Sequence, residues 1–361
     1  MAQEYSIRPY ESGDEEGIVQ LLQLVFNGWP NFDLDCSPVD HWRWKYLCNP
    51  TGESLVIIGE SNGEIVGCSH TYLINLKMGE RIVKGGFAAD AAVHPDYRGK
   101  GLWKGLREAK KTQEVDSGLG FRMGITSNVY IMKHHERTLR STIPYGLTNF
   151  MRIRDVDLHL RRRKTEKAWL KKYAYHLMRK VNAVTTFSKP PASEVDVFAV
   201  KAFDERMKPF WSRVSGQCDL IVERSLEYLN WRYCDGRGGK FTVKLAGKDE
   251  VLGYTVLRAN RRETEYPYGV IEDLTALPER SDVVEALLEG AISHFGDGVN
   301  VIRCRMLDGH PYTKILKRHG FVNSRDSPLI SYDKYVDTDG FDMKQTPVKR
   351  MHFVNGDFDW G

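Results

Sequence analysis

The stretch from Val93 to Trp103 contains the residue types that bind an anion. It reads Val-His-Pro-Asp-Tyr-Arg-Gly-Lys-Gly-Leu-Trp, so two glycines alternate with two cations. Gly99 and Gly101 lack a Cβ atom, which lets the chain turn tightly and point successive backbone N–H groups toward one ligand. Arg98 and Lys100 add positive charge at the rim. The spacing therefore predicts a cradle for a diphosphate.

A strand and a helix must position this loop. Residues 86–93 are small and apolar, as in a buried strand, and Leu102, Leu106 and Ala109 recur at helical spacing. The unpaired N–H groups and the positive dipole end of a helix that begins at Leu102 favour negative charge at the glycines. The alternative is an ordinary strand–turn–helix junction that uses glycine and proline as turn residues.

The loop matches neither Gly-x-x-x-x-Gly-Lys-Ser/Thr nor Gly-x-Gly-x-x-Gly, two common nucleotide-binding patterns. It resembles the acyl-coenzyme A loop of the GNAT acetyltransferase superfamily, whose signature is Gln/Arg-x-x-Gly-x-Gly/Ala after a Val-x-Pro strand end. Arg98 and Gly101 match that signature, and Val93 and Pro95 match the strand end. Trp103 departs from it, because the family has a small residue there.

The resemblance implies that acetyl-CoA binds as a co-substrate and that its pantetheine arm pairs with the strand before the loop. The implied contacts come from that strand, the loop, the start of the helix and an Asn after the next strand. These residues are Ala92, Val93, Arg98, Gly99, Lys100, Gly101, Leu102, Trp103 and Asn128.

Four side chains are candidates for acid–base chemistry in the transfer of an acetyl group. Burial of Asp90 in its strand would raise its pKa and let it deprotonate the incoming amine; a structural hydrogen bond is the alternative. His135 stands where the family has a Tyr that protonates the leaving thiolate, a role that suits an imidazolium. Its alternative is a surface position on a charged helix. Tyr145 and Tyr130 are substitutes for His135.

Length and composition limit the class of protein. A chain of 361 residues with 41% apolar residues predicts two domains, each with its own core. The six cysteines are scattered, without Cys-x-x-Cys pairs or metal-ligand spacing, so we expect reduced thiols and no metal site. The sequence has no signal-peptide pattern and no run of about 20 apolar residues. We expect a cytoplasmic protein with no integral membrane segment.

An internal repeat organises the chain. Residues 42–46, Trp-Arg-Trp-Lys-Tyr, recur as Leu-Asn-Trp-Arg-Tyr at 229–233, and the strand that begins at Asp90 recurs from Asp273. The second copy has acidic residues where the first has its glycines. We therefore expect an α+β fold of two tandem GNAT-like domains, each a mixed, mostly antiparallel central sheet flanked by helices, with the cofactor bound only in the first.

The repeat predicts four regions: a GNAT acetyl-CoA-binding domain at 1–157, a basic helical linker at 158–190, a degenerate GNAT-like domain at 191–335 and a tail at 336–361. We expect the tail to dock onto the body of the protein. Aromatic residues at helical spacing more often pack in the core than contact a ligand. We therefore expect the core to contain Trp29, Trp42, Trp44 and Tyr46.

The linker concentrates positive charge. Residues 161–180 hold nine Lys/Arg and one acid, a net charge of +8 that leaves −4 for the rest of the chain. Apolar residues alternate with these cations, namely Trp169, Leu170, Tyr173, Leu177 and Met178. We expect a solvated interdomain helix whose apolar stripe packs on the domains; contact with an anionic membrane or with tRNA phosphates is the alternative.

These observations favour an N-acetyltransferase that moves acetyl directly from acetyl-CoA to a primary amine of a small metabolite or amino sugar. One rival is a transferase of the same fold that uses aminoacyl-tRNA and binds nucleic acid through the basic helix. A second rival is a protein that binds acyl-CoA without turnover.

Overall fold

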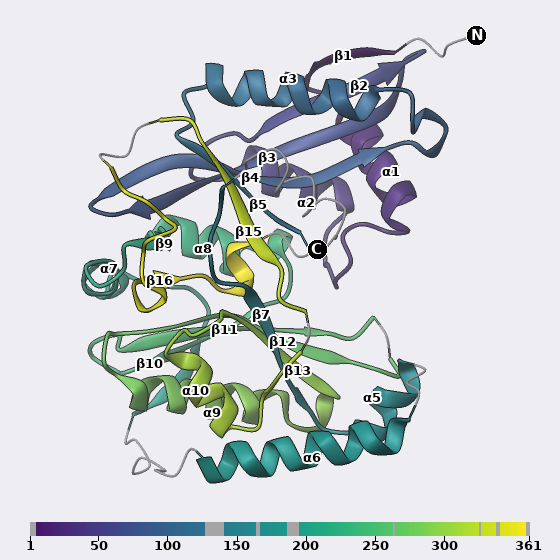
Figure 1. Ribbon diagram of the computed structural model, residues 1–361. Helices are drawn as coiled ribbons and strands as arrows, with labels where there is room; N and C mark the ends of the chain where they lie inside the picture. The colour runs from purple at the N-terminus through teal and green to yellow at the C-terminus, as the bar shows by residue number, and fades with distance from the viewer. Residues whose placement is uncertain are drawn as a thin grey trace.

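The computed structural model describes residues 5–126, 141–163, 167–185, 195–262, 264–324, 326–336 and 340–358. Two mixed β-sheets, each flanked by helices, form the molecule, one above the other in Figure 1. The predicted α+β class is therefore confirmed. Among the described residues the first sheet holds nine strands and the second seven.

The first sheet is built mainly by the N-terminal third of the chain. Its strand order is β1 (Ser6–Pro9), β2 (Leu55–Ser61), β3 (Glu64–Met78), β4 (Arg81–Val93), β5 (Phe121–Thr126), β15 (Leu329–Lys334) and β6 (Ser141–Thr142). Beside β3 lies β9 (Leu220–Val222), which also pairs with β16 (Met351–His352). Figure 1 shows α3 (Leu102–Asp116) above this sheet and α1 (Glu15–Phe26) and α2 (Pro38–Leu47) beneath it.

The second sheet repeats this plan. Its order is β14 (Val322–Asn323), β7 (Leu147–Ile153), β13 (Val301–Leu307), β12 (Tyr268–Ala276), β11 (Gly253–Asn260), β10 (Thr242–Ala246) and β8 (Val197–Val200). The helices of this half are α5 (Val156–Arg162), α6 (Ala168–Thr185), α7 (Met207–Ser215), α8 (Leu226–Cys234), α9 (Ser281–Phe295) and α10 (Tyr312–Arg318). In Figure 1 α9 and α10 lie below the sheet, and α6 lies at the lower edge of the molecule.

Three strands cross between the halves, and one of them is β9 of the second predicted domain, which pairs with β3 of the first sheet. β7 lies in the first predicted domain but pairs antiparallel with β13 of the second sheet, from Leu147–Leu307 to Ile153–Val301. β15 lies in the second predicted domain but pairs with β5 of the first sheet. The sheets therefore cross the boundaries 1–157 and 191–335. Alternation of apolar residues specifies which face of a strand is buried but not which strand lies beside it.

The halves also meet at equivalent residues of the repeat. The rings of Trp44 and Trp231 stack with centroids 4.8 Å apart, and each indole N–H donates to the main-chain oxygen of the other residue at 3.2 Å. Trp42, Trp44 and Tyr46 are fully buried, so their predicted place in the core is confirmed. The tail is also buried from Met351 to Phe358, as expected.

Several ionisable groups are buried in this fold. Burial lowers the pKa of His41 to about 3, of His70 to about 4 and of His352 to about 3, so these imidazoles are neutral at neutral pH. Burial has the opposite effect on Asp357, raising the pKa of its carboxyl to about 6.

We expect the free energy of unfolding to fall steeply between about pH 6 and pH 4. As the pH falls below about 6.5, the three histidines bind protons in the unfolded chain but not in the folded one. Asp357 has the opposite effect, because its raised pKa lets the folded chain bind one proton that the unfolded chain does not yet bind. These four groups alone give a net difference of two protons, which corresponds to about 3 kcal/mol per pH unit. The lowered pKa values of His159 and His310 add to this slope. Urea unfolding followed across this range would measure the slope, and a flat profile would contradict the account.

Candidate functional site

The loop between β4 and α3 has the geometry of an anion cradle. After β4 the chain forms one turn of 3₁₀-helix at Pro95–Tyr97, then passes through Gly99 with φ +73° and Gly101 with φ +86°. Residues with a side chain rarely adopt such left-handed φ angles, so the backbone requires glycine at both positions. Gly101 is the N-cap of α3, and Leu102 is fully buried, which fixes the helix start. Backbone N–H groups of the first helical turn have no partner within a helix.

The charge around the cradle is positive. The Arg98 Nε donates to the Val93 carbonyl at 3.3 Å, and the Lys100 ammonium lies 5.4 Å from the centre of the Tyr97 ring. The first turn of α3 contains no acidic residue, so nothing there competes with an anion for the helix dipole. Trp103 is half exposed beside the cradle. The structure thus brings together the loop residues predicted from the sequence.

The strand that leads into the loop is irregular near its end. A bulge interrupts the pairing of β3 with β4, since Cys68 faces Ala92 but His70 faces Ala89. On its other side β4 pairs with β5 only at Gly86 and Phe87 within the described residues, after which the two strands separate. Within the part of the chain that the structure describes, no strand pairs with this edge of β4 at Ala92 and Val93.

The bulge is centred on Asp90, whose φ is +33°. Its carboxylate accepts hydrogen bonds from the Trp29 indole at 2.9 Å, the Lys45 ammonium at 2.6 Å and the Tyr46 hydroxyl. Its main-chain oxygen accepts from His70 Nδ1 at 2.7 Å. These partners come from the α1–α2 connection, α2 and β3, so separate segments of the chain converge on one residue of β4.

The sequence-based expectation for the pKa of Asp90 is wrong. Burial alone raises the pKa of this carboxyl, but the positive charge of Lys45, the His70 ring and the hydrogen bonds from Lys45 and Tyr46 outweigh burial and lower the pKa to about 2. A carboxylate with so low a pKa is a weak base. The geometry favours the alternative, a structural role for the hydrogen bonds of Asp90.

The remaining predicted catalytic residues are placed only in part. Asn128, Tyr130 and His135 lie outside the described residues, so their predicted roles stay predictions. Tyr145 is half-buried and packs against the core cluster that also holds Trp42. Sequence reasoning missed Lys45 and its neighbours as partners of Asp90, although the repeat offered a signal: it preserves both a Tyr at the end of the helix and an Asp in the strand.

The second copy keeps this buried arrangement. The Tyr254 hydroxyl donates to Asp273 at 2.9 Å, and the Tyr233 hydroxyl lies 3.4 Å from the same carboxylate. The Arg224 guanidinium, 3.2 Å from this carboxylate, has the place that the Lys45 ammonium has in the first copy. The start of α9, however, carries an Arg280–Asp282 ion pair of 2.7 Å instead of glycines.

The C-terminal tail fills the gap that opens in the second sheet. β12 and β13 pair from Tyr268 to Ile271 and then separate, as β4 and β5 do. The Asn355 amide donates to Glu272 at 2.5 Å, and a Cβ on Gly356 would lie 3.1 Å from the Glu272 carbonyl. Ala276, which corresponds to Val93, is covered by α10: its N–H donates to the Tyr312 hydroxyl at 3.1 Å, and its carbonyl lies 3.4 Å from the same hydroxyl.

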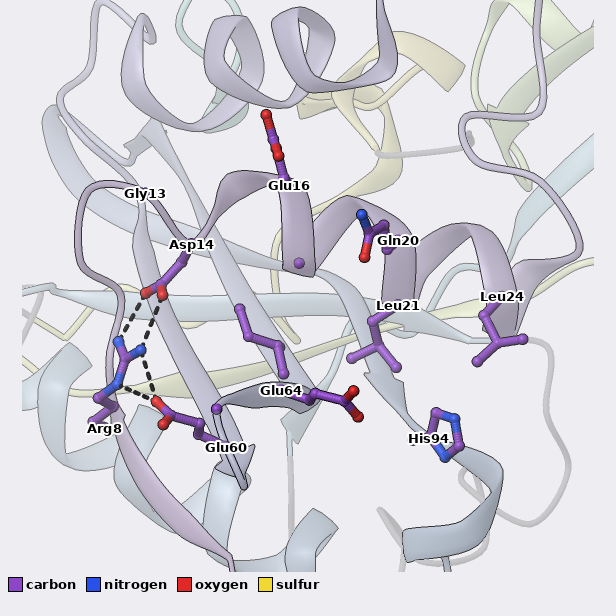
Figure 2. A pocket seen from close by; sticks show the side chains of 13 residues that line it. Arg8, Gly13, Asp14, Glu16, Gln20, Leu21, Leu24, Glu60, Glu64 and His94 are labelled. Atoms are coloured by element: carbon purple, nitrogen blue, oxygen red, sulfur yellow. Dashed lines mark hydrogen bonds and ion pairs between the residues drawn. The ribbon is translucent and has the colours of Figure 1, made fainter.

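A groove of about 670 Å³ lies between α1 and the β2–β3 hairpin (Figure 2). At one end the Arg8 guanidinium contacts Asp14 at 2.8 Å and Glu60 at 2.9 Å. Glu16 and Glu64 are exposed, and neither forms an ion pair within the part of the chain that the structure describes. His94, two residues after Ala92, lines the groove near Leu21 and Leu24.

The described ranges contain neither a membrane span nor a metal cluster. No helix there is both long and apolar enough to cross a bilayer. No group of three or more His, Cys, Asp or Glu side chains there is arranged to hold a metal ion.

We expect Lys45→Met to destabilise the fold by about 3–5 kcal/mol, because it leaves the Asp90 carboxylate buried without its cation. Tyr46→Phe removes one neutral donor and should cost only about 1–2 kcal/mol. Chemical denaturation of both variants measures the difference. The double variant Lys45→Met/Asp90→Asn is the control, since it should recover much of the lost stability; equal losses in Lys45→Met and the double variant would contradict the pairing.

A family model described as the acetyltransferase (GNAT) domain matches residues 6–133. No protein of curated function matches the chain significantly in sequence.

Similar solved structures share the fold at low sequence identity. A probable N-acyltransferase of unknown function from Enterococcus faecalis has a TM-score of 0.61 and 9% identity, with 92% of this chain and 72% of that chain covered. A GCN5-related N-acetyltransferase from Anabaena variabilis has a TM-score of 0.59 and 11% identity, with 92% and 73% covered. Eis1 from Mycobacterium abscessus has a TM-score of 0.52 and 14% identity, with 91% and 73% covered.

The family match begins at β1 and includes the bulged strand, the glycine loop and α3, which are the elements that form the cradle. Residues 6–133 therefore match the GNAT acetyltransferase domain, and the chain as a whole shares the fold of the solved structures named above.

Proposed function

We propose that the protein is an acetyl-CoA-dependent N-acetyltransferase that acts on a primary amine. The observation that carries the proposal is the continuity of two features: the positive glycine cradle at the start of α3 and the open edge of β4 directly before it. A diphosphate in the cradle would place the attached pantetheine arm along that edge. We propose the cytoplasm as the location, in keeping with six free cysteines.

Acetyl-CoA would supply the activated thioester, and the chain would orient and polarise it. The Val93 N–H would donate to the arm or to the thioester oxygen, because it faces the edge at which β5 no longer pairs with β4, whereas the neighbouring His94 N–H donates to Val66 of β3. Asp90 would act as a positioning residue: its four partners hold the bulge, and the bulge sets the direction of the next N–H groups. His135 and Tyr145 remain the candidates for protonating the thiolate.

The groove in Figure 2 supports an amine as the acceptor. Ala92 belongs to the core cluster formed with α1, and strand alternation places His94 on that same face of the sheet. The groove thus opens about two strand residues, roughly 7 Å, from the proposed thioester position. Glu16 and Glu64 would attract an ammonium group through charge, and loss of a proton from that group would precede attack.

We expect Arg98→Ala and Gly101→Asp each to weaken acetyl-CoA binding about tenfold or more. The first removes a charge-assisted contact to phosphate, and the second places a carboxylate and a strained residue in the cradle. Gly118→Asp is the matched control, because Gly118 has φ +70° at the other end of α3 and a Cβ added to it would meet no atom within 4 Å. Calorimetry gives the affinities, and unchanged binding in both cradle variants would contradict the site.

The same titration should saturate at one acetyl-CoA per chain, because the Tyr312 hydroxyl hydrogen-bonds to the main chain of Ala276 at the equivalent position in the second sheet and the tail fills the gap beside Glu272. Release of thiol in the presence of an amine panel then separates an acetyltransferase from a protein that only binds acyl-CoA. Saturation at two equivalents would contradict the closed second site.

We expect Glu16→Gln/Glu64→Gln to raise the KM for a cationic amine about threefold to tenfold with little change in kcat, because charge attraction assists binding and not the chemical step. Glu53→Gln is the control, since Glu53 is exposed before the opposite end of β2. Steady-state assays with the best amine of the panel measure both constants. An unchanged KM would exclude the groove as the route of the acceptor.

A further inference from the structure

The basic helix α6 does not pack as its sequence suggested. We expected its apolar stripe to lie against the domains, but Trp169 is 71% exposed, Tyr173 is 67% exposed, and Leu170 and Leu177 are also exposed. Tyr175 is the buried contact: its hydroxyl donates to the Ile153 carbonyl at 3.0 Å and accepts from the Ile153 N–H at 2.9 Å. The helix is thus anchored to the body of the protein through one face, and another face is both apolar and exposed.

The exposed apolar residues form one stripe. Residues 169, 173 and 177 are four apart and therefore lie on one face of the helix, with Leu170 next to them. At about 100° per residue, Lys180 lies at the C-terminal end of the stripe, His176 borders one side of it, and Lys171 lies about 100° beyond Leu170 on the other side. This is the pattern of a helix that lies in the plane of a membrane interface.

A basic groove adjoins the same helix. A cavity of about 690 Å³ lies between α6, α9 and α10, and its lining includes the side chains of Arg152, His176, Lys180, Arg318 and His319, with Glu289 as the acidic member. Arg318 also contacts Glu285 at 2.8 Å. Because His176 and Lys180 belong to both the groove and the border of the stripe, the two features form one continuous surface, which we call the α6 surface.

We propose that the α6 surface docks onto a bilayer containing anionic phospholipids. Trp169 and Tyr173 would sit at headgroup depth, Leu170 and Leu177 would reach the acyl chains, Lys180 would contact lipid phosphates, and Lys171 would add attraction over a longer range. Charge complementarity selects this occupant. A nucleic acid would use the cations but leave the two leucines unburied, and a second copy related by a twofold axis would bring like charges together.

Docking of this kind is compatible with catalysis in the first half. Figure 1 shows α6 at the opposite end of the molecule from α3, so the cofactor cradle would face away from the bilayer. The inference does not rest on the proposed acetyl transfer, and it is tested by binding alone.

The test is cosedimentation of the full chain with vesicles of phosphatidylcholine, with or without phosphatidylglycerol. We expect binding to the anionic vesicles that is at least about tenfold tighter than to neutral ones and weakens with added salt. Trp169→Ser/Leu177→Ser should lower the partition coefficient about tenfold or more, and Lys171→Ala/Lys180→Ala should do the same. Ile82→Ser/Val115→Ser is the matched control, because these side chains are about half exposed outside α6. Circular dichroism checks the fold of every variant.

Three results would overturn the proposal. The first is equal binding to neutral and anionic vesicles, or no binding to either. The second is binding of RNA that Lys171→Ala/Lys180→Ala abolishes, without binding to vesicles, which would assign the α6 surface to nucleic acid. The third is a dimer in analytical ultracentrifugation that Trp169→Ser/Leu177→Ser dissociates, which would assign it to a second copy of the chain.

Discussion

The buried carboxylate of Asp90 is the interaction on which the candidate site depends. A charged group in a strand interior is costly unless a cation and several donors surround it, and here Lys45, Tyr46 and Trp29 supply them. A non-glycine residue at φ +33° also requires support from its surroundings. Because the supporting residues come from α2 and the α1–α2 connection, the bulge in β4 and the packing of these segments are one structural unit.

The repeat helps to separate structure from chemistry in this unit. The second copy keeps the strand carboxylate at Asp273 and its tyrosine partners, although the loop before α9 has no glycine cradle and the tail closes the gap between β12 and β13. Because the second copy retains this carboxylate where no cofactor is expected to bind, the carboxylate has a structural role that does not depend on catalysis. This comparison and the low pKa of Asp90 both favour positioning over proton abstraction.

The sequence predicted local features well because local residues determine them. Gly99 and Gly101 have the left-handed angles that their spacing suggested, and Leu102 begins the helix. The partners of the Asp90 carboxylate lie 44 to 61 residues away, and no periodicity specifies such pairs. The packing of α6 was mispredicted for a related reason. An apolar stripe shows that a helix has an apolar side, but not whether protein or another phase covers that side.

The exchange of strands gives the two halves a shared core. Without β15, the edge of β5 would lose its antiparallel partner, and the buried Glu114 would lose part of its environment. Glu114 accepts from Tyr335 at 2.7 Å and contacts Arg122 at 3.2 Å, while Arg122 also pairs with Asp333. A chain cut within 158–190 would therefore leave an open sheet edge and incompletely paired charges beneath α3. The helix that carries the glycine cradle thus depends for its support on residues that lie far later in the chain. Tyr335, for example, follows Glu114 by 221 positions.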